Sequence, residues 1–164
     1  MKAIVYTEYG TPDVLHLQDV AKPAPKEREI LVRVLATPVN YGDLLARNFG
    51  NVSASEFNMP APLWLPVRLA FGWRKPKQPI LGGEFAGEVE AVGKAVTRFK
   101  PGDQVFGYLG PRMGAYAEYL CMSEAGMVAI KPANLSYAEA AAAPYGAIMA
   151  TGLLRHGKLQ RGHK

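Results

Sequence analysis

The chain has 164 residues, of which 49% are hydrophobic, 20% charged and 10% aromatic. This composition is typical of one globular domain and excludes a disordered chain, and a domain of this length buries roughly 70% of the surface that its unfolded chain exposes. The net charge of +5 is mild, so it bears on partners only where positive side chains gather on one face.

Most of the first 130 residues form short runs of β-branched, aromatic and aliphatic side chains, separated by glycine and proline. In Glu88-Val89-Glu90-Ala91-Val92 the apolar and acidic side chains alternate, which predicts a strand with one buried and one wet face. Lys100-Pro101-Gly102-Asp103 predicts a turn between two strands. Seven strands are expected, and their number indicates a barrel or a sandwich: residues 2–6, 15–20, 29–37, 87–92, 104–107, 115–121 and 127–130.

Helices are predicted at three places. Asn40 can cap a short helix that runs to about Asn48, with Asp43 in its first turn. Ser136-Tyr137-Ala138-Glu139 fits a capping box ahead of four alanines, and Pro144 should end or kink that helix. A further helix is expected over about residues 147–156, with Gly157 as a left-handed cap.

Residues 51–79 fit neither pattern and are expected to be an inserted excursion. Its middle, residues 63–77, carries three large aromatic side chains and four positive charges without an acidic residue. We favour a loop that packs its aromatic side chains on the barrel and keeps its cations in water. A flap over a binding cleft, a membrane-surface segment and a nucleic-acid patch are the alternatives.

Metal and nucleotide motifs are scarce. A catalytic zinc needs about three protein ligands, and the chain offers one cysteine, Cys121, with His16, His156 and His163, so no metal site is predicted. None of the seventeen glycines is placed to give the G-x-G-x-x-G fingerprint of a dinucleotide-binding domain. The lone cysteine is compatible with a reducing compartment and no export signal or membrane span is apparent, so a cytoplasmic protein is expected.

Four segments, in this order, resemble the medium-chain dehydrogenase/reductase superfamily: Asn40-Tyr41-Gly42-Asp43 with Arg47, then residues 79–93, 99–107 and 114–119. The resemblance implies a mainly β fold, a GroES-like and partly open β-barrel with a few short helices, which is the catalytic domain and precedes a Rossmann domain. Zinc-dependent members carry a cysteine where this chain has Asn40, and Gly-His-Glu where it has Gly82-Gly83-Glu84. The chain therefore resembles the zinc-independent, quinone oxidoreductase-like branch.

The same resemblance implies the domain organisation. Residues 1–135 should form the GroES-like catalytic domain, with the excursion at 51–79, and residues 136–164 a helical connector toward a cofactor-binding domain. Family members begin the first strand of that domain at about residues 159–164, where this chain ends. We therefore expect a fragment or a truncated reading frame.

Three site residues are carried over from the resemblance. Asn40 should line the nicotinamide end of the cleft, in contact with substrate or cofactor, and Tyr41 could donate to the oxygen on which charge develops. Thr151 matches a threonine beside the nicotinamide. Each has a structural alternative, namely helix capping for Asn40 and packing for Tyr41 and Thr151. Asp43 and Arg47 should form an ion pair beside the site, and the role of Glu84 is open, with a structural one favoured.

The function implied is that of the substrate-side domain of an NAD(P)H-dependent oxidoreductase, which transfers hydride to a quinone, enone or related carbonyl compound. NADP or NAD would be bound mainly by the absent domain, without zinc, and the isolated chain should be inactive. Its partners would be a small-molecule substrate and its own Rossmann domain in a homo-oligomeric parent, with no nucleic acid and no membrane. A stand-alone GroES-like binding or scaffold module is the alternative, and a nucleic-acid footprint on the positive residues of 68–77 and of the tail is a weaker third.

Overall fold

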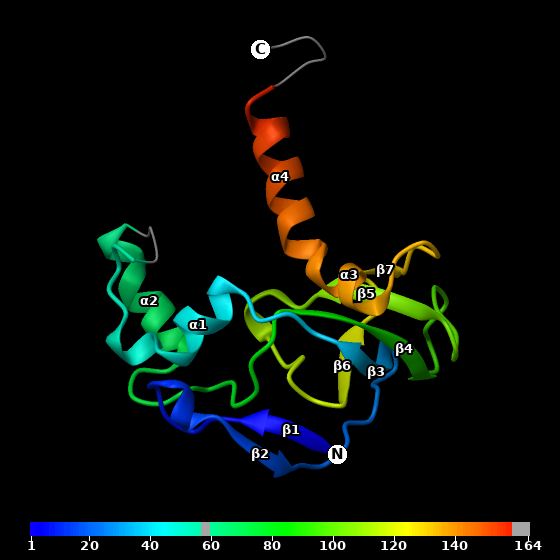
Figure 1. The fold of residues 1–164 in the computed structure, drawn as a ribbon, viewed down its shortest axis with the longest axis horizontal. Helices are drawn as coiled ribbons and strands as arrows, with labels where there is room; N and C mark the ends of the chain where they lie inside the picture. Colours follow the sequence, from blue (N-terminus) through cyan, green and yellow to red (C-terminus); the bar gives the residue numbers. More distant parts are fainter. Residues whose placement is uncertain (57–59, 159–164) are drawn as a thin grey trace.

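The fold is built on one curled antiparallel sheet, seen in a computed structural model that describes residues 1–56 and 60–158. The strand order β6-β3-β4-β5-β7 leaves β6 and β7 at the two ends of the sheet, which curls into a half-barrel (Figure 1). This confirms the predicted, partly open GroES-like barrel. The strands are β3 (Glu29–Ala36), β4 (Glu84–Val92), β5 (Gln104–Tyr108), β6 (Tyr119–Ser123) and β7 (Met127–Ile130).

A second, two-stranded sheet lies beside the first. It pairs β1 (Lys2–Val5) with β2 (His16–Asp19) in antiparallel register. The amide of Ile4 donates to the carbonyl of Tyr116 at 2.8 Å, and the amide of Tyr6 donates to that of Pro79 at 2.9 Å. Backbone hydrogen bonds therefore attach the small sheet to the segments that precede β4 and β6.

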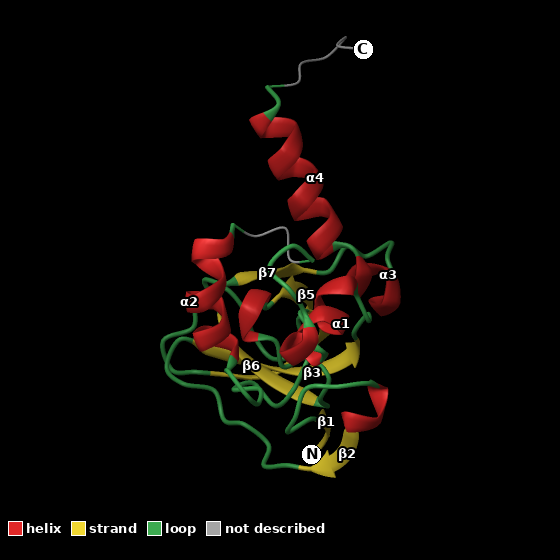
Figure 2. Cartoon of the chain, turned by 90° about the vertical axis from the view of Figure 1, so that its left-hand side faces the viewer, coloured by secondary structure: helices red, strands yellow, loops and turns green. Residues whose placement is uncertain are grey.

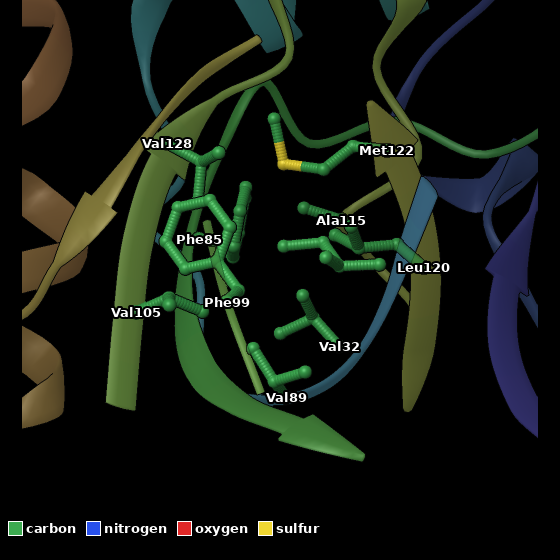
Figure 3. Close-up of a cluster of buried hydrophobic side chains, with 10 residues drawn as sticks. Val32, Phe85, Val89, Phe99, Val105, Ala115, Leu120, Met122 and Val128 are labelled. Atoms are coloured by element: carbon green, nitrogen blue, oxygen red, sulfur yellow. The ribbon is translucent and has the colours of Figure 1, made fainter. Parts of the chain in front are cut away.

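The barrel core fills the concave side of the sheet (Figure 3). Ile30 and Val32 of β3 belong to one hydrophobic cluster with Phe85 and Val89 of β4. Phe99 and Val105 are part of the same cluster. Register shifts between β3 and β4, at Leu31/Val32 and at Val34/Ala36, mark bulges. Bulges increase local twist and bend a strand, which helps the sheet to wrap around this core.

All seven predicted strands are present, and the limits of five agree with the prediction to within one residue, whereas two differ by more. β4 begins at Glu84, three residues earlier than expected, because residues 84–86 pair with residues 106–108 of β5. The predicted strand 115–121 is divided. Only its end belongs to β6, whereas residues 116–118 run along β1. The turn with Gly102 joins β4 to β5 as predicted.

The capping predictions are confirmed for the two short helices. α1 (Tyr41–Arg47) and α3 (Tyr137–Ala142) both begin with reciprocal capping boxes, formed by Asn40 with Asp43 and by Ser136 with Glu139. α4 (Pro144–His156) begins earlier than expected, because Pro144 occupies its first turn, where a missing amide proton costs nothing. Gly157 is not a left-handed cap, since its φ is −71°. α4 projects away from the barrel (Figures 1 and 2).

The expectation of a loop in the excursion is wrong. Residues Ala61–Phe71 form the helix α2, with Pro66 in its interior. Prolines normally break a helix, but this one is held by packing: the rings of Trp64 and Phe71 lie 5.1 and 4.9 Å from the ring of Phe49. Trp64 and Phe71 thus pack on Phe49, beside the barrel, whereas Trp73 is 52% exposed. Within the described part of the chain, no helix has the length and apolar character needed to cross a membrane.

Candidate active site

Asn40 is the N-cap of α1, and both the oxygen and the nitrogen of its side-chain amide form hydrogen bonds. Oδ1 accepts a hydrogen bond from the amide of Asp43 at 3.2 Å, as a helix cap does. Nδ2 points the other way and donates to Oε2 of Glu84 at 2.9 Å. The cap therefore fixes which end of the Asn40 amide faces the barrel.

Glu84 connects three elements. It is the first residue of β4 and only 3% exposed. Its Oε2 accepts from Asn40 at the start of α1, while Oε1 accepts from the backbone amide of Tyr145 at 2.8 Å, in the first turn of α4. A carboxylate at a helix N-terminus is favourable because free amide donors and the helix dipole both attract negative charge. The structural role favoured for Glu84 is thus present, with a link to Asn40 in addition.

The ion pair expected between Asp43 and Arg47 is not formed. Asp43 is 2% exposed and accepts from the amides of Gly82, at 3.1 Å, and Asn40, at 3.0 Å. Arg47 donates from Nε to the carbonyl of Gly10 at 3.1 Å. The expectation is wrong because spacing on one helix face ignores the backbone donors and acceptors that neighbouring segments supply.

A cleft of about 180 Å³ opens at these groups. Its wall combines small and aromatic residues, among them Asn40, Gly83, Phe71, Tyr108, Met113 and Tyr145. The rings of Tyr108 and Tyr145 lie 5.9 Å apart. Burial raises the pKa of the Tyr108 phenol, and nearby Tyr145 and Glu84 raise it further, so the hydroxyl keeps its proton and can donate.

The structure places the three predicted site residues differently. Asn40 lines the cleft, whereas Tyr41 is 66% exposed and Thr151 is exposed on the projecting part of α4, so neither lines it. Their roles stay predictions. Sequence reasoning missed Tyr108 and Tyr145. The only local signals were that Tyr108 directly follows a predicted strand and that Tyr145 follows Pro144.

A larger hollow of about 540 Å³ lies between β1 and the end of β3 and is lined mainly by aliphatic side chains. The smaller cleft is the better candidate because its wall holds the buried carboxylate of Asp43, the amide of Asn40 and two phenols. Among residues 1–56 and 60–158, no group of three or more His, Cys, Asp or Glu side chains is placed to hold a metal ion.

Residues 26–132 match the family described as Alcohol dehydrogenase GroES-like domain. The chain is 37% identical over 152 residues to a 2-methylene-furan-3-one reductase of Solanum lycopersicum, covering 88% of this chain and 34% of the relative. It is 38% identical over 141 residues to a quinone oxidoreductase of Pseudomonas aeruginosa, covering 86% of this chain and 36% of the relative. The chain thus spans about a third of the length of these relatives.

Solved structures show the same similarity. The quinone oxidoreductase from Coxiella burnetii superposes with a TM-score of 0.79 at 30% identity, covering 99% of this chain and 46% of that one. The Escherichia coli quinone oxidoreductase complexed with NADPH gives a TM-score of 0.74 at 28% identity, covering 96% and 41%.

Proposed function

Because this chain belongs to the alcohol dehydrogenase GroES-like domain family of the medium-chain dehydrogenase/reductase superfamily, we propose that it is the substrate-side domain of an NAD(P)H-dependent oxidoreductase. The reaction is hydride transfer to a quinone, enone or related carbonyl compound, without zinc. One observation carries this proposal most directly. Among the residues that the structure describes, the cleft presents the amide of Asn40 and no thiolate or imidazole, beside the buried carboxylate of Glu84, which already accepts two hydrogen bonds.

The side chains of the cleft suit a carbonyl substrate. Nδ2 of Asn40 carries two protons, and the Glu84 carboxylate accepts one of them. The other is available to a substrate oxygen, and the protonated phenol of Tyr108 is a second donor on the same wall. The nicotinamide, when bound, supplies the hydride. Donors aimed at the oxygen on which negative charge develops stabilise the transition state.

The size of the cleft supports a division of labour between two domains. A ligand pocket usually measures about 300–1,000 Å³, whereas this cleft holds about 180 Å³. The chain would therefore form one wall of the site, and a cofactor-binding domain would form the other. Residues 136–164 are the proposed connector to that domain. Holding hydride donor and acceptor in near-attack geometry then needs both domains, so the isolated chain should be inactive.

The remaining parts of the proposal concern cofactor and surroundings. NADP or NAD would bind mainly to the other domain, consistent with relatives described as an NADPH-dependent alkenal/one oxidoreductase and as a complex with NADPH. Tyr41 and Thr151 are both exposed and hence accessible to that domain. A homo-oligomeric parent located in the cytoplasm, without nucleic-acid or membrane partners, completes the proposal.

A chimera tests the proposal. Residues 1–156 replace the corresponding segment of the Pseudomonas aeruginosa quinone oxidoreductase, and NADPH consumption is followed with a quinone and with an enone. We expect the chimera to consume NADPH with at least one of them, and the isolated 164-residue chain to consume none. A folded chimera without activity would instead favour a stand-alone binding module, and an active isolated chain would refute the division of labour.

A further inference from the structure

We infer that Glu84 is a positioning residue that holds the Asn40 amide in the one orientation that offers an N–H to the substrate. The inference rests on the proposed function. It assigns a role to the buried carboxylate of Glu84, which the proposed reaction does not otherwise use.

The Asn40 amide is fixed by two neighbours of opposite character. The amide N–H of Asp43 is shared between Oδ1 and the backbone carbonyl of Asn40, while the Glu84 carboxylate accepts from Nδ2. A flipped amide would set Oδ1 against the carboxylate and Nδ2 against the N–H, so both contacts would become repulsive. Only one orientation satisfies both neighbours, and it leaves one Nδ2 proton for the cleft.

Glu84 can do this because it is itself held at its other end. Oε1 accepts from the amide of Tyr145 at 2.8 Å, and the residue is only 3% exposed, so little water competes. A carboxylate accepts with both oxygens, whereas a glutamine of the same shape accepts with one atom only. A glutamine here would satisfy either Tyr145 or Asn40, but not both. The geometry therefore requires two acceptor atoms on this side chain, which a carboxylate provides.

The same carboxylate also sets where the donor lies. Asn40 belongs to the start of α1, and Tyr145 to the start of α4, which projects from the barrel (Figure 1). Glu84, the first residue of β4, is hydrogen-bonded to both. Because hydride transfer depends on displacements of about 1 Å, a tie between the substrate donor and the helix that leaves the barrel is a positioning device.

A reversal of hydrogen-bond polarity tests the inference. Three forms are compared with the wild type: Glu84→Gln, Asn40→Asp and the double variant. In the double variant the new glutamine accepts from Tyr145 and donates to the new aspartate, whose second oxygen still caps α1. The side chains at positions 40 and 84 are thus hydrogen-bonded again, with donor and acceptor exchanged and the net charge unchanged. The cleft, however, has lost the N–H of Asn40.

Stability is measured on the 164-residue chain by urea unfolding, and kcat and KM on the chimera described above. Glu84→Gln and Asn40→Asp should each lower the unfolding midpoint, and the double variant should recover most of that loss. Glu84→Gln should lower kcat at least tenfold with a smaller change in KM, and the double variant should stay at least tenfold below wild type in kcat despite its recovered stability.

The outcomes separate the two proposals. A wild-type chimera without activity refutes the proposed function. An active chimera whose kcat is unchanged by Glu84→Gln, or is recovered in the double variant, overturns the positioning role. Side-chain amide NMR of the 164-residue chain decides independently of activity. The Asn40 pair of resonances, assigned by its absence in Asn40→Asp, should shift in Glu84→Gln, and unchanged resonances would also overturn the inference.

Discussion

Glu84 caps a helix that begins far from it in the sequence: its Oε1 accepts from the amide of Tyr145 at 2.8 Å across a separation of 61 residues. Ala143, at the N-cap of α4, makes no side-chain cap hydrogen bond of its own. The carboxylate therefore supplies from β4 what the local sequence lacks.

Replacing this carboxylate should destabilise the chain. Glu84→Ala leaves the donors of Asn40 and Tyr145 without their acceptor in a buried place, which we expect to lower the free energy of unfolding by about 1–3 kcal/mol. Urea unfolding followed by circular dichroism measures it. Glu90→Ala is the matched control, because Glu90 lies on the same strand but is exposed and pairs with Lys22 at the surface. Equal effects of the two substitutions would contradict the capping role.

Gly82 and Gly102 both have a positive φ, but only Gly82 is crowded, so alanine substitutions distinguish the cost of backbone strain from that of steric overlap. Gly82 has a φ of +95°, and a Cβ there would lie 2.6 Å from Cδ1 and 2.8 Å from the backbone N of Tyr116. Gly102 has a φ of +88° with nothing within 4 Å of a Cβ. Gly102→Ala should cost about 1–2 kcal/mol from φ alone, and Gly82→Ala roughly 1–3 kcal/mol more. An equal loss of unfolding free energy in Gly102→Ala and Gly82→Ala would contradict this prediction.

Cys121 should react slowly for a cysteine that is not fully buried. Burial, with a smaller contribution from Glu29, raises the pKa of its thiol from 9.0 to about 11. The thiolate is the reacting form, so the higher pKa of the thiol should slow alkylation by iodoacetamide at pH 8 about 100-fold relative to the unfolded chain in urea. The rate should increase with pH until about pH 11. A rate that levels off near pH 9 would show that the thiol is not perturbed.

The projecting helix should make the isolated chain associate. Ile148, Met149, Leu153 and Leu154 of α4 are 42%, 46%, 68% and 54% exposed. Exposed apolar patches favour association, so light scattering should show a mass that rises with concentration. Leu153→Lys should reduce this association more than Ala150→Lys, which adds the same charge at an exposed position but removes little apolar surface. A chain that stays monomeric at all concentrations would contradict the prediction.

Local patterns were predictable, and long-range contacts were not. The capping boxes at Asn40 and Ser136 could be predicted because both partners lie three residues apart. Glu84 and Asn40 are 44 residues apart in the sequence, and Asp43 and Gly82 are 39 apart, so no local sequence pattern predicts these contacts. α2 was missed for another reason. Pro66 is unfavourable in a helix, and the aromatic packing that compensates involves Phe49, outside the helix.

The fate of the hydride distinguishes zinc-free hydride transfer to the substrate from a zinc-dependent reaction and from no reduction at all. NADPH that carries deuterium at the transferable position is supplied to the chimera with an enone, in the presence of a zinc chelator, and the product is analysed by mass spectrometry. The account predicts a reduced product that carries the deuterium, at a rate that the chelator does not change. A folded chimera that yields no deuterated product, or one whose activity the chelator abolishes and added zinc restores, would contradict it.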